Sequence, residues 1–442
     1  MSKSFSCINH SVDYISLITV PGFLYNLFAD PDIIRLPGPL TSLQSLIALW
    51  ISKRRAPKSI KAYNSIGGGS PILQYSNDQA RLITEAIRER HGVEVKSYVG
   101  MRYWHPFTEE ALEEIQRDGI TELVIVPLYP QFSISTSGSS LRILQEEFAK
   151  KQEIYGAETG TLRHTVVPSW FERPGYINAM VNLIQKEIDA FSDKQLEEGN
   201  NEIHVLFSAH GVPQSYIEAG DPYQEQIIEC VRRISERIEV MKVKGGPPSV
   251  TSHLSYQSRV GPIEWLRPYT DDVLPELGEK GVKNLVVVPI SFVSEHIETL
   301  EEIDMEYCEL AHENGIVNWR RVPALNTDET FINDMADLVV DALQEPTFTV
   351  TEACIANNCE IELDSDSKRA EILRGAGASM EDIDSDMMNE LTGISSQVKR
   401  QDKEAINAER LNGRLAIFGV LVTILVELFS GKSILHMFDG LL

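Results

Sequence analysis

Residues 206–213 read LFSAHGVP, and this stretch places a histidine where an apolar run ends. The run over 203–207 is rich in large and β-branched residues, which is typical of a buried strand, whereas Gly211 and Pro213 break it. We therefore expect His210 at the carboxyl end of a strand. Ligands of open α/β sheets bind in the crevice at that end.

Other apolar runs alternate with helical patterns, which predicts βαβ units and parallel sheets covered by helices on both faces. We expect strands at 95–99, 122–128, 203–207, 250–254, 285–292 and 321–325. Helices are expected at 77–90, 109–118, 139–151, 175–191, 222–239 and 298–314. Two units of about 150 residues fit between positions 23 and 345, and we place a cleft between them.

The overall composition excludes some classes of protein. The chain has 442 residues, of which 43% are hydrophobic, so it is not a disordered protein. Its net charge of −25 makes nucleic acid an unfavourable partner. The cysteines at 7, 230, 308, 354 and 359 form no CxxC pair, which indicates a reducing compartment without structural disulfides.

The carboxyl-terminal part differs in composition from the rest of the chain. Residues 350–404 are rich in Glu, Asp and Ser, which predicts a solvated linker with at most a short helix. Residues 415–429 read LAIFGVLVTILVELF, a helix of about 22 Å, which is shorter than a bilayer core of about 30 Å. Extension back to position 406 makes a transmembrane helix the favoured interpretation, with a buried or interfacial helix as the alternative.

A second polar turn follows the strand expected at 285–292 and presents Glu295, His296 and Glu298. In the helix that follows, Glu298, Glu302 and Glu306 recur every four residues, which predicts three carboxylates stacked on one face. One interpretation is an exposed acidic helix. The other is a conduit for a divalent cation or for protons, because crowded carboxylates have raised pKa values.

Two further strand ends carry aromatic and cationic residues. Arg102 stands in MRYWHP after the strand at 95–99, and Tyr129 stands in YPQFS after the strand at 122–128. The turn YNSIGGGSP begins at Tyr63 and matches neither GxGxxG nor a P-loop. Aromatic rings and arginine around a cleft suit a large planar anion, although each would also serve in core packing.

Taken together, these stretches resemble the ferrochelatases. The resemblance is carried by FLYNLFADPDIIRLP from Phe23, YNSIGGGSPI, GMRYWHP, LYPQFS, LFSAHGVP with GDPY, YQSRVGPIEWL, and PISFVSEHIETLEEID from Pro289. It implies two Rossmann-like, chelatase-type domains, each with a parallel four-stranded sheet. It also implies an enzyme that inserts Fe²⁺ into protoporphyrin IX held in the cleft, with no cofactor required.

The same resemblance implies roles for individual residues. His210 would abstract a proton or contact the metal, and Glu298, with His296, would form the opposing acidic site. Arg102 and Tyr129 would lie opposite His210, near the other face of the macrocycle. The expected metal ligands are His210, Glu298, Glu302 and Glu306. The expected substrate-binding residues are Tyr63, Ser70, Arg55 and Lys58, which would hold the propionates, and Trp265, which would form a wall.

The tail carries a resemblance of its own. ERLNGRLAIFG from Glu409 is similar to the chlorophyll a/b-binding motif ExxNGRxAMxG, in which a glutamate binds chlorophyll and pairs with an arginine of a second helix. This implies chlorophyll or carotenoid at Glu409, Asn412 and Arg414, a homodimer through the tail, and a plastid location at the thylakoid or inner envelope membrane. A plain membrane anchor is the alternative.

The chain departs from the family pattern at two places. The first 22 residues lack the family's strand and glycine-proline turn, and we consider residues 15–20 as a substitute strand. Ile134 occupies the place of an internal cysteine that ligates an iron–sulfur cluster in animal members, so no cluster is expected. Two alternatives to the enzyme are therefore kept: an impaired, membrane-tethered tetrapyrrole- or pigment-binding protein, and a chelatase for another metal or porphyrin.

These observations define the expected domain organisation. We expect an atypical segment over 1–22, a first domain over 23–170 completed by a helix over 328–345, a second domain over 171–327, an acidic linker over 346–404 and a transmembrane segment over 405–442.

Overall fold

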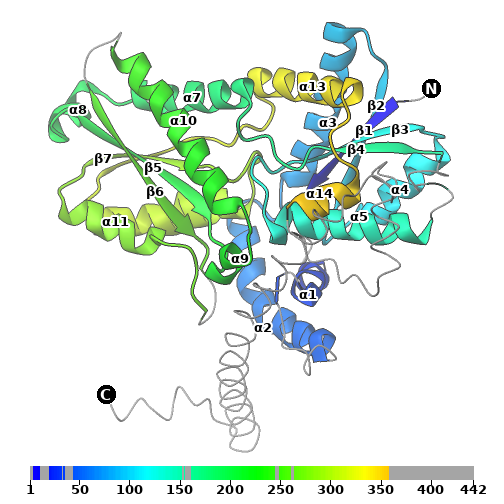
Figure 1. Cartoon of the computed structure of the whole chain (residues 1–442). Helices are drawn as coiled ribbons and strands as arrows, with labels where there is room; N and C mark the ends of the chain where they lie inside the picture. The colour runs from blue at the N-terminus through cyan, green and yellow to red at the C-terminus, as the bar shows by residue number, and fades with distance from the viewer. Residues whose placement is uncertain are drawn as a thin grey trace, which may run out of the picture. The chain divides into compact units, whose positions relative to one another are not determined.

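The computed structural model describes residues 3–9, 19–31, 33–34, 43–151, 154, 161–243, 248–259 and 263–357, with backbone only at 3–9 and 241–243. These residues form two four-stranded parallel sheets with the same strand order (Figure 1). The first sheet has the order β2-β1-β3-β4, with β1 Lys3–Asn9, β2 Val95–Met101, β3 Glu122–Pro127 and β4 Arg163–Val166. The second has the order β6-β5-β7-β8, with β5 Glu202–His210, β6 Ser249–Gln257, β7 Asn284–Pro289 and β8 Asn318–Arg321.

Helices connect the strands and cover both faces of each sheet. The α-helices are α1 Val20–Ala29, α2 Gln44–Ser65, α3 Ile72–His91, α4 Thr108–Arg117, α5 Ser139–Lys150, α7 Pro174–Asp189, α8 Asp193–Glu198, α9 Gln214–Glu218, α10 Tyr223–Val243, α11 Thr270–Glu279, α12 Cys308–Glu313, α13 Glu329–Gln344 and α14 Val350–Ala356. Two π-helices, η2 Ile134–Gly138 and η3 Glu298–Tyr307, follow β3 and β7, the corresponding strands of the two sheets. The predicted α/β architecture with parallel sheets is confirmed.

One hydrophobic core runs beneath both sheets. It joins residues of α3, α7, α10 and α13 to the inner faces of β3, β5 and β7, and α7 and α13 run along the top of Figure 1. Separate cores lie on the opposite faces, one between the first sheet, α4, α5 and α14, and the other between the second sheet, α11, η3 and α12. Every residue of β7 is buried, as expected for a strand covered on both faces.

The opening segment of the chain differs from its prediction. β1 lies in the middle of the first sheet, between β2 and β3, so this segment supplies a strand after all. Its sequence KSFSCIN lacks the continuous apolar run that usually marks a buried parallel strand, so the pattern gave little signal. The substitute strand over 15–20 is wrong at its end, because Thr19 is in a turn and Val20 begins α1. Residues 15–18 lie outside the described residues.

The strand expected at 321–325 is also misplaced. The strand is β8, which ends where the prediction begins, at Arg321. It is an edge strand with the half-exposed sequence NWRR, whereas the buried Val322 and Leu325 lie in the loop that leads to α13. Here the apolar residues mark a buried loop and the polar ones mark the strand.

The region expected as an acidic linker begins with folded structure. Phe348 forms a bridge with Val166 of β4, and Thr349 and Glu352 form a capping box at the start of α14. Val350, Ala353 and Cys354 are buried in the core on the outer face of the first sheet. Residues 346–357 therefore belong to the folded body, and 358–404 lie outside the described residues.

A hairpin of α1 and α2 packs at the carboxyl ends of the strands. Its core includes Val20, Phe23 and Tyr63, and it contacts Tyr103 after β2 and Ile297 before η3. The hairpin therefore touches loops that follow strands of both sheets. Within the described parts of the chain, no helix is both long and apolar enough to cross a membrane, and the helix expected over 405–442 lies outside them.

Candidate active site

His210 is the last residue of β5, at the carboxyl edge of the second sheet, as predicted. Its backbone N–H donates to Ser291 Oγ at 3.0 Å, and its carbonyl accepts from the Tyr223 hydroxyl at 2.9 Å. Its Nδ1 lies 2.8 Å from Glu298 Oε2, and its side chain is 34% exposed. The backbone of His210 is thus held by Ser291 after β7 and by Tyr223 at the start of α10, while the ring stays partly accessible.

Gly211 lets the chain turn away immediately after this histidine. A Cβ at Gly211 would lie 2.7 Å from the Gln257 carbonyl and 3.3 Å from the ring of Trp265. Any side chain there would push β5 away from β6, so the glycine is required by this close approach. Trp265, the expected wall residue, therefore lies beside the residue that follows His210.

Glu298 begins η3, and the structure corrects the expected geometry of this helix. Residues 298–307 form a π-helix rather than an α-helix. Its hydrogen bonds join residues five apart, and such segments are frequent at functional sites. Glu302 bonds to Ser258, whereas Glu306 lies 3.9 Å from Lys58 of α2. Ser258 therefore lies within reach of both Glu302 and Glu298, whereas Glu306 contacts Lys58, and the stacking of all three carboxylates stays a prediction.

Ser258 connects the first two carboxylates. Its hydroxyl lies 2.8 Å from Glu302 Oε2 and 3.3 Å from Glu298 Oε2, and its backbone N–H donates to Glu302 Oε1 at 3.1 Å. Tyr307 donates its hydroxyl to the same Glu302 Oε1 at 2.9 Å. Glu298 and Glu302 thus share one hydroxyl donor at the end of β6.

The environment of the site shifts the pKa values of its ionisable groups in different directions. Burial alone would raise the pKa of Glu298, but the charge and hydrogen bond of His210 lower it to about 2. Burial alone would lower the pKa of His210, but the charge and hydrogen bond of Glu298 raise it. Burial and the charge of Glu298 raise the pKa of Glu302 to about 7. Near neutral pH the site therefore holds an ionised Glu298 beside a carboxyl that gains or loses a proton easily.

His296 is buried and plays a different part from His210. Burial lowers the pKa of His296, and its Nδ1 lies 3.2 Å from the Ser294 carbonyl. Its ring packs edge-on against Phe292 at 4.2 Å, and Phe292 in turn lies 6.0 Å from the ring of His210. His296 therefore reaches His210 through an aromatic ring rather than by direct contact.

Arg102 belongs to a separate buried group, which we call the Asp30 cluster: Asp30, Arg102, Tyr103, Ser139 and Arg142. The Asp30 carboxylate is fully buried and accepts hydrogen bonds from Arg102 at 2.6 Å, Ser139 at 2.7 Å, Tyr103 at 2.8 Å and Arg142 at 3.1 Å. The cluster joins the end of α1 to the loop after β2 and to α5. Arg102 is held there, and it makes no described hydrogen bond to His210 or Glu298.

The remaining expected residues lie around the hairpin and the strand ends. Tyr129 is half-buried in the loop after β3. Tyr63 is buried at the end of α2, where burial and the charge of Glu298 raise its pKa, so it lies within electrostatic reach of the site. Arg55 and Lys58 are exposed on α2, and Ser70 lies in the turn that precedes α3. The structure thus brings Tyr63 near Glu298, and it places Lys58 against Glu306.

Among the described residues, no group of three or more His, Cys, Asp or Glu side chains is arranged to hold a metal ion. The four expected ligands therefore do not form one ready-made site.

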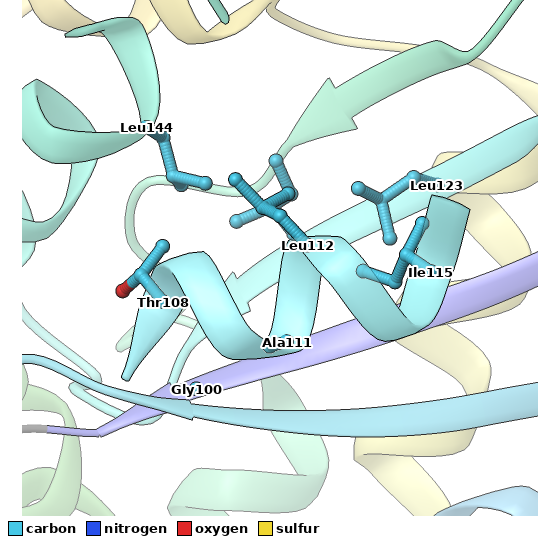
Figure 2. Close-up of a pocket in the computed structure, with 8 residues that line it drawn as sticks. Gly100, Thr108, Ala111, Leu112, Ile115, Leu123 and Leu144 are labelled. Atoms are coloured by element: carbon cyan, nitrogen blue, oxygen red, sulfur yellow. The ribbon is translucent and has the colours of Figure 1, made fainter. Parts of the chain in front are cut away.

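Two cavities of the described structure lie away from His210. One, of about 10 Å³, lies inside the first domain between Gly100, Thr108, Leu112 and Leu144 (Figure 2), and has no more room than about one water molecule. The other, of about 540 Å³, lies between residues 167–173 and α13.

Sequence reasoning overlooked several residues that organise the site. Asp30 and Ser258 both stand inside the quoted stretches, but neither was given a role. A signal existed for Asp30, because an acidic residue directly after an apolar helix needs a partner if it is buried. Ser258 gave no signal, because its role depends on a backbone φ of +63° that only the fold reveals.

The chain is similar to known proteins over most of its length. The ferrochelatase family model matches residues 16–343. The chain is 47% identical over 431 residues to chloroplastic ferrochelatase-2 of Arabidopsis thaliana, covering 95% of this chain and 77% of that protein. It is 47% identical to the ferrochelatase of a Picosynechococcus strain, covering 94% of this chain and 93% of the other. The solved structure of SirB from Bacillus subtilis shares 10% identity at a TM-score of 0.44, covering 79% of this chain and all of that one. The chain belongs to the ferrochelatase family.

Proposed function

We propose that the protein inserts Fe²⁺ into protoporphyrin IX to form protohaem, the last step of haem synthesis. The observation that supports this most directly is the contact of His210 with Glu298 at the carboxyl edge of the second sheet, in a chain of the ferrochelatase family. The reaction removes two protons from pyrrole nitrogens and places a divalent cation between them. It therefore needs a base and anionic oxygens near the centre of a flat ring, and the site provides both.

His210 is the base in this proposal. In its neutral form, with Nδ1 facing Glu298, the His210 ring receives a pyrrole proton on Nε2. The ionised Glu298 stabilises the imidazolium that forms, as a carboxylate does in other histidine bases. Glu302, with its pKa of about 7, can accept a proton in turn at neutral pH. The proton removed from the macrocycle therefore has a route from His210 toward Glu302.

The other expected residues are assigned by the same proposal. Glu306, Glu302, Glu298 and His210 guide Fe²⁺ in sequence, each contacting it in passing rather than all together. Arg102 and Tyr129 approach the opposite face of the macrocycle. Arg55, Lys58, Tyr63 and Ser70 hold its propionates, and Trp265 packs against it, because cations, hydroxyls and an aromatic wall suit a flat dianion.

A direct assay tests the enzyme against its alternatives. Purified protein is mixed anaerobically with Fe²⁺ and protoporphyrin IX, and haem absorption and porphyrin fluorescence are followed together. A ferrochelatase produces the absorption bands of haem while porphyrin fluorescence disappears. A tetrapyrrole-binding protein would change the fluorescence without forming haem, and turnover only with Co²⁺, or only with another porphyrin, would indicate a different chelatase.

We also propose that residues 405–442 attach the protein to a plastid membrane, the thylakoid or the inner envelope. Support comes from the apolar run at 415–429 and from relatives named as chloroplastic. In this proposal Glu409, Asn412 and Arg414 bind chlorophyll or carotenoid, and Glu409 pairs with Arg414 of a second copy. Deletion of residues 400–442 should release an active protein from membranes. Continued sedimentation with membranes would place the anchor elsewhere.

A further inference from the structure

Side chains hold the backbone of His210 at a point where the neighbouring strand has already ended. The ladder between β5 and β7 ends at the pair of Ser208 and Pro289, and the Ile290 N–H adds one bond to the Ser208 carbonyl at 3.2 Å. His210 lies two residues further along β5. Its N–H donates to the Ser291 hydroxyl rather than to a carbonyl of β7. A side chain therefore takes the place of the missing strand.

The bonds around His210 form a closed circuit, which we call the hydroxyl circuit: the His210 N–H, the Ser291 hydroxyl, the Tyr223 hydroxyl and the His210 carbonyl. The N–H lies 3.0 Å from Ser291 Oγ, the two hydroxyl oxygens lie 2.8 Å apart, and the Tyr223 hydroxyl lies 2.9 Å from the carbonyl oxygen. An N–H only donates and a carbonyl only accepts. Tyr223 therefore donates to the carbonyl, and Ser291 donates to Tyr223. Hydrogen bonds linked in this way polarise and strengthen one another.

Separate elements set the positions of the two hydroxyls. Tyr223 and Ser291 are each 5% exposed, which limits competition from water. Tyr223 begins α10, and its backbone N–H donates to Asp221 Oδ1 at 3.0 Å. The same carboxylate accepts hydrogen bonds from the Ser133 hydroxyl at 2.8 Å and the Ile134 N–H at 2.9 Å, in the segment that follows β3. The hydroxyl circuit is therefore anchored to segments that follow strands of both sheets.

We propose that Tyr223 is a positioning residue for metal insertion: its hydroxyl, with that of Ser291, holds the His210 backbone and keeps the imidazole in one orientation. This inference rests on the proposed function, in which His210 is the base. The hydroxyls bond to the backbone of His210, whereas its Nδ1 lies 2.8 Å from Glu298, so they act through the placement of the strand end. A misplacement of about 1 Å can cost on the order of 100-fold in rate, and partial loosening should cost about tenfold.

Two substitutions open the hydroxyl circuit with little change in side-chain volume. Tyr223→Phe removes one hydroxyl, and Ser291→Ala removes the other. Tyr98→Phe is the matched control, because the buried Tyr98 also donates its hydroxyl to a partner, Asp118 at 2.7 Å, but on the first sheet. Melting temperatures of all variants show whether the fold is kept.

The expected result is a loss of kcat without a loss of substrate affinity. Tyr223→Phe and Ser291→Ala should each lower kcat about tenfold, with KM for Fe²⁺ and for protoporphyrin IX unchanged. The double variant should also lose about tenfold, because groups that act as one unit give non-additive losses. Tyr98→Phe should match the wild type. An unchanged kcat in Tyr223→Phe, a raised KM instead of a lowered kcat, an equal loss in Tyr98→Phe, or a loss of about 100-fold in the double variant would overturn the inference.

A measurement without substrates keeps this inference separate from the proposed function. Histidine is labelled isotopically, and the proton NMR signals of the imidazole N–H groups are recorded. The proton on Nδ1 of His210, which faces the Glu298 carboxylate, should give a downfield signal that is absent from His210→Ala. This signal should broaden and move upfield in Tyr223→Phe and in Ser291→Ala, because the imidazole no longer keeps one orientation.

The two measurements have distinguishable failures. Absence of haem formation by the wild type would contradict the proposed function alone. An unchanged downfield signal in both Tyr223→Phe and Ser291→Ala would contradict the positioning role of Tyr223, whether or not the wild type forms haem.

Discussion

The Nδ1 atom of His210 lies 2.8 Å from Oε2 of Glu298, although 88 residues separate them in the chain. The contact arises because β5 and β7 are hydrogen-bonded neighbours in one parallel sheet, so the segments that follow them emerge at the same edge. The imidazole comes from the strand end itself, and the carboxylate comes from the first residue of η3. The sheet therefore brings the two segments to one edge, and residues 290–297 with η3 place the carboxylate beside the imidazole.

Replacement of His210 by alanine should abolish metal insertion while porphyrin binding remains nearly intact. The base is lost, but the apolar and aromatic surroundings remain, so turnover should fall at least about 100-fold. Haem formation and porphyrin fluorescence titration measure the two properties. His204→Ala is the matched control, since His204 lies on the same strand and bonds to His253 instead. Undiminished turnover in His210→Ala would remove this residue from the mechanism.

Glu302 should make the folded protein less stable as the pH rises. Its pKa is raised from 4.5 to about 7 in the folded state, so between these values the folded protein binds more protons than the unfolded chain. The free energy of unfolding therefore falls with rising pH, by at most about 1.4 kcal/mol per pH unit from this group. Urea unfolding between pH 5 and pH 8 should show this decline in the wild type and a weaker decline in Glu302→Gln.

The exposed Glu309 on α12 provides the control for this measurement. Glu309→Gln should keep the slope of the wild type. Identical slopes in the wild type and Glu302→Gln would show that Glu302 is not the group responsible.

Asp30→Asn should destabilise the fold more than an ordinary loss of an ion pair. The fully buried Asp30 carboxylate balances two guanidinium groups, Arg102 and Arg142, and an amide would remove the buried negative charge that both contact. We expect a loss of about 3–5 kcal/mol in the free energy of unfolding. Asp337→Asn, which breaks an exposed pair with Arg90, should cost about 1 kcal/mol or less. Equal losses in the two variants would contradict the structural role of the Asp30 cluster.

Two glycine substitutions should change stability in opposite directions. A Cβ at Gly100 would enter the small cavity of Figure 2 and meet Thr108 and Ala111 at 3.6 to 3.9 Å, an ordinary contact distance. Gly100→Ala should therefore stabilise the protein by about 0.5–1 kcal/mol. A Cβ at Gly175 would lie 2.3 Å from the Asp334 side chain, so Gly175→Ala should destabilise it by about 1–3 kcal/mol. The melting temperatures of both variants are compared with that of the wild type. A lower melting temperature of Gly100→Ala would show that the cavity cannot accept a methyl group.

Prediction from sequence succeeded where periodicity carried the information. The strands β2, β3, β5, β6 and β7 and most long helices were found because continuous apolar runs and helical spacing are strong signals. β1 and β8 were missed or displaced because their residues are largely polar and their pairing depends on distant segments. The position of His210 followed from local sequence alone.

The finer geometry of the site was not accessible in the same way. A spacing of four residues suggests an α-helix, whereas Glu298–Tyr307 adopts a π-helix. Arg321 forms ion pairs with Asp304 within η3 and with Glu295 just before it, a contact between separate elements that no local pattern encodes. Ser258 likewise acquires its role through a turn. Each of these features depends on tertiary contacts that form only when the second sheet is assembled.

The identical strand order of the two sheets has a consequence for how such a molecule originates. Tandem duplication of one ancestral module, followed by fusion, produces two halves with corresponding strands and corresponding π-helices. The two halves differ in chemistry, because the polar side chains of η2, which reads ISTSG, are hydroxyls, whereas η3 reads ETLEEIDMEY and carries several carboxylates. A pair of identical modules would carry two equivalent sites, whereas in this chain the histidine–carboxylate pair stands in the second half.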